Sequence, residues 1–287
     1  MKYTVIQNIQ ISAYFDCINK PKNLVQRAID IGLSGIAITD HECLSAAIKL
    51  NQIQKDCPEG FKIALGNEIY LVDSRINGQK YYHFILIAKD KIGFRQLREL
   101  SSRAWMQSYF DKGLERVPTL KSEIEEVIER QPGHVIATTA CIGGELSSSI
   151  LRMEKARTVG DMNEATAAYN QITTFIDWCK SIFNDDFYIE CAPAASKDQI
   201  IVNKKLVQIA QVYNIKMVIG CDAHYLTKAD RYVHKAYLNS KGGEREVDEF
   251  YEYSYLQTEE EIKQNLTPSI VELYEQCVII VWRFMIK

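Results

Sequence analysis

The sequence predicts an α/β fold, built either as a closed barrel or as an open sheet with helices packed on it. Along the 287 residues, short apolar runs rich in β-branched residues alternate with longer stretches of helical periodicity, which is the pattern of such folds. The first unit is a helix that begins at Pro21 and stops at Gly32, with the strand 35–38 directly after it. Polar residues able to bind metal follow or open several predicted strands, and barrel enzymes collect their reactive side chains at strand ends in this way.

The other elements continue this alternation. Helices are predicted over about 44–55, 94–105, 120–130, 161–182 and 202–212, and the capping box Thr258–Glu261 opens a last short one. Strands are predicted at 63–65, 69–72, 84–88, 134–137, 187–189 and 217–219. The Asn77-Gly78 pair predicts a hairpin, so the next strand is antiparallel and His83 opens it at the rim. The polar segment 107–118 is predicted to be a loop, and the 161–182 helix is expected to bury Tyr169.

Composition and charge limit the classes of function. The length suits one large domain or two small ones, and 47% hydrophobic residues are ample for a core. A net charge of −3 and a pI near 6.0 do not give the basic face that a protein needs to hold nucleic acid by itself. The eight cysteines form no CxxC pair and no signal segment follows Met1, so we expect reduced thiols and a cytoplasmic location. The apolar run 277–282 is too short to cross a membrane.

Seven possible metal ligands lie at the ends of predicted strands or just upstream of them. They are Asp16, His41, Glu68, His83, Cys141, Asp222 and His224. Imidazole, carboxylate and thiolate together suit zinc, manganese or iron. Seven ligands could hold two ions with help from water, and paired ions activate water for the hydrolysis of phosphoesters.

Most of these residues also have a plainer interpretation. His41 alone suits a capping or surface histidine, and His83, which stands between aromatic residues, could equally be a packed histidine. Asp16 could equally serve a turn, and Cys141 alone suits a buried thiol. Glu68 favours function, because it lies between apolar neighbours and a buried carboxylate needs a partner or a metal.

Asp222 and His224 are the sharpest pair, since a carboxylate and an imidazole two residues apart after a buried strand can point into one pocket. Glu190 also ends a strand, and we expect it to support a ligand or form an ion pair rather than bind metal itself. His134 follows Pro-Gly and is expected at a surface turn, whereas His234 is expected to pack or cap on a helix.

The order of these segments resembles the PHP (polymerase and histidinol phosphatase) domain at the N-terminus of the bacterial DNA polymerase III alpha subunit. The resemblance covers about residues 14–277 and is carried by the stretches 35–41, 65–70, 82–90, 93–97, 102–105, 141–146, 187–190 and 222–225. Residues 16–21 look most like the bacteriophage-encoded members. The resemblance implies a distorted (β/α)7 TIM-like barrel over residues 1–265, with a closing helix and a divergent tail over 266–287.

The resemblance also implies a metal-dependent phosphoesterase, acting in polymerases as a 3′–5′ exonuclease. His41, Glu68, His83, Cys141, Asp222 and His224 match family ligands, and Asp16 matches another. Glu68, Asp222 and His83 are the expected catalytic residues. Glu68, His83 and Cys141 would share one ion, and Asp16, His41 and His224 would hold another.

The chain departs from the family at the opening His-x-His motif. No histidine precedes His41, and Gln7, Asn8 and Gln10 are the nearest polar residues. A neutral amide is a poor ligand for zinc or manganese beside imidazole, so one site should be empty or weakened and a two-metal mechanism damaged.

Two main hypotheses follow from this departure. The first is a metal-dependent phosphoesterase that acts on DNA 3′ ends or a small phosphate ester, in a bacterial cytoplasm. The second is a non-catalytic module that stabilises a replicative polymerase body or binds a partner. A third hypothesis, a decoy that engages a host polymerase, has no residue in its support. We expect no polymerase active site in the chain and no membrane partner.

Overall fold

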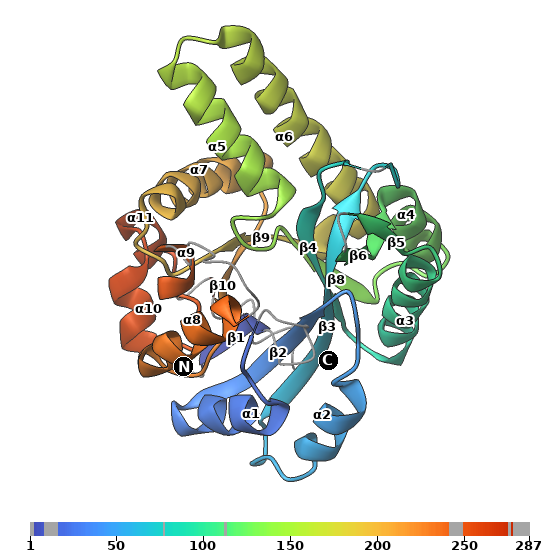
Figure 1. Ribbon diagram of the computed structural model, residues 1–287, viewed down its shortest axis with the longest axis vertical. Helices are drawn as coiled ribbons and strands as arrows, with labels where there is room; N and C mark the ends of the chain where they lie inside the picture. The colour runs from blue at the N-terminus through green and yellow to red at the C-terminus, as the bar shows by residue number, and fades with distance from the viewer. Residues whose placement is uncertain are drawn as a thin grey trace.

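Seven strands pair in a closed ring that forms the centre of the molecule (Figure 1). The computed structural model describes residues 3–8 (backbone only), 17–76, 78–111, 114–240, 249–274 and 277. The ring strands are β1 (Tyr3–Asn8), β2 (Leu33–His41), β3 (Lys62–Val72), β4 (Tyr82–Ala88), β8 (Val135–Thr138), β9 (Phe187–Cys191) and β10 (Met217–Ala223).

The pairings confirm the predicted seven-stranded barrel and its distortion. β1 pairs with β2 and β10, and the ring continues through β9, β8, β4 and β3 back to β2. All of these pairs are parallel except the two made by β4, which is antiparallel to β3 and to β8. The hairpin predicted before His83 is therefore present, although Asn77 lies outside the described residues.

Helices surround the ring and cover its outer face (Figure 1). They are α1 (Pro21–Asp30), α2 (Ala47–Gln54), α3 (Lys91–Met106), α4 (Lys121–Glu129), α5 (Glu145–Thr158), α6 (Met162–Phe183), α7 (Lys197–Tyr213), α8 (Arg231–Asn239), α9 (Glu249–Glu252), α10 (Glu259–Asn265) and α11 (Pro268–Val271). The long pair α5 and α6 projects beyond the barrel at the top of the view. After α11, Tyr274 and Cys277 are buried in the main core.

Side chains of each strand alternate between the barrel interior and the helices, because successive residues of a strand point to opposite faces. The outer set joins the large core between strands and helices, as Ile36, Phe84 and Ile219 do. A smaller apolar cluster fills the lower barrel, and it contains Ala37, Ile85, Ile87, Ile136, Ala140, Tyr188 and Val218. Polar side chains are therefore expected at the inward positions above this apolar cluster, nearer the mouth of the barrel.

Several sequence predictions of local structure were wrong or incomplete. Segment 107–118 is not a loop in its described part, because β5 (Tyr109–Asp111) and β6 (Leu114–Arg116) form a hairpin and β7 (Pro118–Leu120) pairs with β3. The two predicted strands 63–65 and 69–72 are a single strand, β3. Helix α5 was not predicted, and Tyr169 of α6 is 52% exposed while Ala168 is buried.

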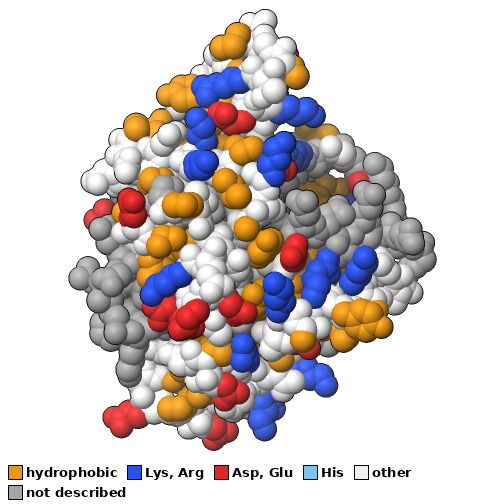
Figure 2. Space-filling view, turned by 90° about the vertical axis from the view of Figure 1, so that its left-hand side faces the viewer, with side chains coloured by type: hydrophobic (Ala, Val, Ile, Leu, Met, Phe, Trp, Pro, Cys, Tyr) orange, Lys and Arg blue, Asp and Glu red, His pale blue; other side chains and the backbone are white. Residues whose placement is uncertain are grey.

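The surface agrees with the weak net charge. On the face shown in Figure 2, basic and acidic side chains are interspersed, and no continuous basic stripe crosses its described part. None of the helices in the described ranges is both long and apolar enough to serve as a membrane span.

Candidate metal centre

Five polar residues occupy the inward positions of five different strands near the mouth of the barrel. They are His41 of β2, Glu68 of β3, His83 of β4, Glu190 of β9 and Asp222 of β10. Each is an even number of residues from an inward apolar residue of its own strand, as Asp222 is from Val218. The period of two that builds the apolar floor thus also selects the polar side chains above it.

Glu68 is the centre of the tightest group. Its side chain is fully buried, and its Oε1 lies 2.8 Å from Nδ1 of His83 while its Oε2 lies 3.9 Å from Nε2 of His41. One ligand atom from each of the three residues lies within 4.8 Å of the others. The ladder explains this closeness, because His41 is the direct partner of Glu68 in the β2–β3 pairing. Three such donors at this spacing could share one metal ion.

Tyr70 positions the rings of both histidines, and sequence reasoning missed it. Its ring stacks on His83 with centroids 5.3 Å apart and lies 5.5 Å from the ring of His41. Tyr70 is the inward residue two positions after Glu68 and the direct partner of His83 in the β3–β4 pairing. The inward parity of β3 was the sequence signal that could have identified it.

Cys141 extends the group toward β8. Its Sγ lies 3.4 Å from Nδ1 of His83. Burial raises the pKa of the thiol well above its ordinary value, and the carboxylates of Asp222 and Glu68 raise it further. A metal ion would have to displace that proton, so binding at this thiol should tighten as the pH rises.

Asp222 and His224 form a second group at the end of β10, where His224 directly follows the strand. His224 Nδ1 lies 2.7 Å from the backbone oxygen of Asp222 and 3.7 Å from its Oδ1. When Nδ1 of a neutral imidazole carries the proton, Nε2 is the unprotonated nitrogen. Asp222 has a left-handed backbone (φ 45°), and Asp222 and Cys141 both line a cavity of about 20 Å³, room for about one water-sized group.

The electrostatics of Asp222 link the two groups. Burial raises its pKa to about 6, and His224 opposes that rise while Glu68 adds to it. The imidazoles of His83 and His41 also lower this pKa. The carboxylate of Asp222 therefore lies near all four of these side chains.

Glu190 lies in the same interior but outside the three-residue group. Its carboxylate is buried and accepts a hydrogen bond from the hydroxyl of Thr138. Burial raises the pKa of Glu190 to about 8, and Glu68 and Asp222 contribute to the rise, which the Thr138 bond opposes. This environment matches the sequence expectation of a supporting residue rather than that of a residue paired with a cation.

The remaining candidates divide as follows. Asp16 and Gln10 lie outside the described residues, and Gln7 and Asn8 belong to β1, of which only the backbone is described. His234 is fully buried and packs 5.3 Å from the ring of Tyr225, as expected. His134 bonds Asp90 at 2.6 Å beside the start of α3, with a side chain that is 28% exposed.

The donors that are present fit a divalent transition metal. Glu68 is a fully buried carboxylate between two imidazoles, and Asp222 Oδ1 is buried with no hydrogen-bond partner among the described residues. Such groups are costly to bury unless a cation or a hydrogen bond compensates them. The structure groups His41 with Glu68 and His83, whereas the sequence analysis grouped it with Asp16 and His224.

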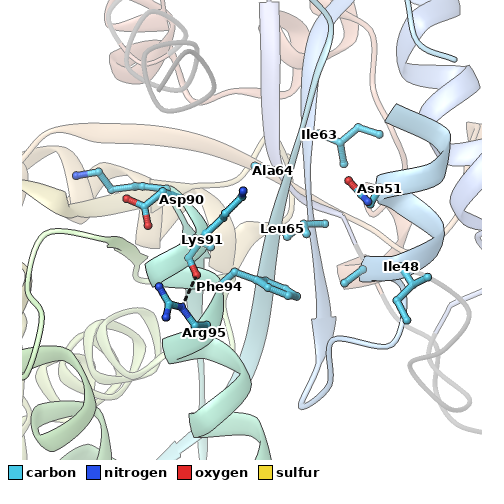
Figure 3. Close-up of a pocket in the computed structure, with 12 residues that line it drawn as sticks. Ile48, Asn51, Ile63, Ala64, Leu65, Asp90, Lys91, Phe94 and Arg95 are labelled. Carbon is cyan, nitrogen blue, oxygen red and sulfur yellow. Dashed lines mark hydrogen bonds between the residues drawn. The ribbon is translucent and has the colours of Figure 1, made fainter. Parts of the chain in front are cut away.

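A separate cavity of about 700 Å³ lies between α2 and the start of α3 (Figure 3). Ile48 and Asn51 line it from α2, Ile63–Leu65 line it from β3, and Phe94 and Arg95 line it from α3. None of the six predicted ligands that the structure describes contributes to its wall. This groove is therefore distinct from the candidate metal centre.

Comparison of the sequence with protein-family models identifies the family. The model of the PHP domain matches residues 11–194. The chain belongs to the PHP domain family. The match includes His41, Glu68, His83, Cys141 and the Glu190 strand, whereas β10 with Asp222 and His224 lies beyond it.

Relatives of this PHP domain are DNA polymerases. It is 42% identical over 278 residues to a DNA-directed DNA polymerase of Bacillus phage SPbeta, a match that covers 92% of the chain and 21% of the relative. It is 29% identical over 238 residues to the DNA polymerase III subunit alpha of Borreliella burgdorferi, a match that covers 80% of the chain and 19% of the relative. The chain thus spans about a fifth of the length of these curated relatives.

A solved structure with a similar course is that of a Bifidobacterium adolescentis protein inferred to be a metal-dependent phosphoesterase. It is 15% identical to the PHP domain, with a TM-score of 0.43, and the alignment covers 78% of this chain and 88% of that one.

Proposed function

We propose that this PHP domain binds a divalent transition metal and retains a weak phosphoesterase activity of the 3′–5′ exonuclease type. The main support is the group formed by His41, Glu68 and His83, whose ligand atoms lie within 4.8 Å of one another. The chain belongs to a family related to replicative polymerases, which supports DNA 3′ ends as the substrate class, with a small phosphate ester as the other option.

His41, Glu68 and His83, with Cys141 beside them, would hold the first ion, and zinc, manganese or iron suits this donor set. Bound there, the ion would lower the pKa of water and stabilise charge on a phosphoryl oxygen. Glu68, with one carboxylate oxygen near His83 and the other near His41, would supply the negative charge of this ligand set. Asp222 would be the group that faces the ion from the opposite strand, so we assign catalytic roles to Glu68, His83 and Asp222.

The second ion is proposed to be weakly held. Its remaining ligands are Asp222, His224 and Asp16, and the sequence contains no histidine before His41 to complete them. The backbone of β1 lies directly beside β10, with Asn8 paired to Ala223. The end of β1 is therefore next to Asp222 in the fold, where an amide would be a poor replacement for imidazole.

The test combines metal content with nuclease activity. Gently purified protein should carry about one transition metal ion per chain and degrade a 3′-labelled single strand slowly in manganese. Glu68→Gln should lose both properties, whereas Glu145→Gln should keep both. Glu145 is a matched control, because it is also buried but pairs with Lys121. Protein without transition metal would contradict the metal site, and robust degradation abolished by Asp222→Asn would contradict the impairment.

The alternative is a non-catalytic module that supports a polymerase body, and the absent His-x-His motif favours it. In that case the metal would stabilise the barrel without hydrolysis. Chelation would then lower the melting temperature, while the nuclease rate of the wild type would equal that of Glu68→Gln.

A further inference from the structure

We propose that Glu190 is a positioning residue for Cys141, acting through the hydroxyls of Thr138 and Thr139. These two threonines end β8 and begin the turn that brings the thiol to His83. The inference rests on the proposed function, because it concerns the thiol as a metal ligand. It assigns a specific task to a buried carboxylate that the proposed chemistry does not otherwise use.

Three hydrogen bonds connect β9 to Thr138 and Thr139 at the end of β8. The carboxylate Oε2 of Glu190 accepts from Thr138 Oγ1, and its backbone N–H donates to Thr139 Oγ1 at 2.9 Å. The backbone N–H of Thr139 donates to the oxygen of Tyr188 at 3.3 Å. Both threonines are fully buried, so these bonds are shielded from water.

These hydrogen bonds, called here the Glu190 relay, continue into the turn that follows β8. Thr138 Oγ1, while donating to Glu190, accepts from the backbone N–H of Ala140 at 3.4 Å. Ala140 has a left-handed backbone with φ 57°, a conformation that alanine adopts only when its surroundings enforce it. Cys141 is the next residue, so the relay determines the direction in which the chain presents the thiol.

The turn closes tightly on the same side. The backbone N–H of Gly144 donates to the oxygen of Cys141 at 3.0 Å. A Cβ on Gly144 would lie 2.1 Å from the oxygen of Thr139, and one on Gly143 would lie 3.2 Å from Nδ1 of His83. A small displacement of Thr139 or Ala140 would therefore change the contact between the turn and His83, because the turn packs directly against the imidazole.

The carboxylate of Glu190 lies against Gly220 of the neighbouring strand β10. A Cβ on Gly220 would lie 1.7 Å from Glu190 Oε1, so only glycine leaves the required room there. Gly220 is two residues before Asp222 and shares its inward parity. The carboxylate therefore lies one layer below the predicted ligands. The group of ligand atoms found among the described residues does not include Glu190, which is why we assign it a positioning role.

Cobalt replacement tests this role, because a thiolate bound to Co²⁺ gives a charge-transfer band in the near ultraviolet that histidine and carboxylate ligands do not give. Cys141→Ser, which lacks the thiol, gives the absorbance expected without a cobalt–thiolate bond. Thr138→Val keeps the shape of the side chain but removes the hydroxyl, and it should weaken the band and lower the affinity for Co²⁺ about tenfold, as loss of a supporting bond commonly does. Thr138→Ser should restore both.

Variants of Glu190 sharpen the result. Glu190→Gln retains an oxygen that can accept from Thr138 and should keep the band, whereas Glu190→Met should lose most of it. Thr119→Val is the matched control, since Thr119 is an equally buried strand threonine on β7. Equal bands in wild type, Thr138→Val and Glu190→Met would overturn the proposal. So would a loss of band in Thr119→Val of the same size, because that would indicate general destabilisation.

A crystal structure of metal-free Thr138→Val separates this inference from the proposed function. If wild-type protein shows no cobalt–thiolate band, the proposed metal site with Cys141 fails, and the structure still decides the positioning role. Displacement of Cys141 Sγ from its 3.4 Å contact with His83 would support the role of the relay. An unmoved thiol would overturn it. Should Thr138→Val not fold, Thr139→Val serves the same comparison.

Discussion

The two sides of the barrel mouth differ in how their ligands are brought together. On the Glu68 side, made of His41, Glu68, His83 and Cys141, three ligands come from adjacent hydrogen-bonded strands. On the Asp222 side, Asp222 belongs to β10 and His224 directly follows that strand. The neighbouring β1 contains no histidine, and none occurs before His41. If these residues bind metal as proposed, a site built from adjacent strands would depend little on ligands supplied by the other side.

The largest expected effect tests the Glu68 side. Glu68→Gln should lower metal affinity by at least about 100-fold, more than the loss of a supporting hydrogen bond usually costs. The reason is that Glu68 contacts both histidines and supplies the negative charge between them. Competition with a chromophoric chelator measures the affinity, with Glu145→Gln as the control. Affinity equal to that of the wild type would remove Glu68 from the site.

A smaller effect is expected on the Asp222 side. Asp222→Asn should lower the affinity for the tightest ion by no more than about tenfold, while abolishing the residual nuclease activity. The difference arises because His41, Glu68 and His83 would still hold that ion. Calorimetric titration with manganese, together with degradation of a labelled single strand, separates the two readouts. A 100-fold loss of affinity would show that the two sides form a single site.

Introducing histidines from the end of β1 onward would sharpen the comparison further. Asn8→His combined with Gln10→His provides two histidines at the spacing of a His-x-His motif, the first of them near Asp222 because Asn8 pairs with Ala223. We expect a second, weaker manganese ion and a several-fold rise in nuclease rate. Gln7→His with Ile9→His is the control, since it has the same two-residue spacing shifted by one position along the chain. Identical behaviour of the two pairs would argue against a missing-ligand explanation.

The smallest expected effect concerns stability and pH in metal-free protein. The pKa of Glu190 rises from an ordinary 4.5 to about 8 on folding, so the folded chain binds a proton more tightly than the unfolded chain. Its contribution to stability is therefore complete below about pH 4.5 and is lost as the pH rises through about 8. In chelator, the melting temperature should fall by a few degrees more between pH 5 and pH 8 in wild type than in Glu190→Gln. Equal slopes would contradict this burial effect.

Much of the fold followed from strand and helix periodicity. The sequence predicted strands within β2, β8, β9 and β10, and it placed His83 at the start of an antiparallel strand. Helix α5 was missed because its buried face mixes serine and glutamate with apolar residues, as at Ser147 and Ser149. The hairpin of β5 and β6 was missed because three-residue strands leave too few alternating positions to be recognised.

The site was predictable to the extent that strand ends carry its ligands. The positions of His41, Glu68 and His83 followed from runs of apolar residues, and Glu68 was expected beside His83. The place of His41 with them was not expected, because it depends on the β2–β3 register, which is set by pairing along the whole strand. Tyr70 and the Glu190 relay could not be anticipated from type alone. Their roles depend on which residues of other strands lie opposite them, as Gly220 does for Glu190.

The reversed direction of β4 has a consequence for how the chain folds. Its pairing with β3 joins residues close in sequence, such as Tyr70 and His83, whereas ring closure joins β1 to β10 across more than 200 residues. Short-range contacts form sooner than long-range ones, because closing a long loop costs more chain entropy. Glu68 and His83 should thus meet in an early hairpin, so two of the proposed ligands would be together before the barrel has closed.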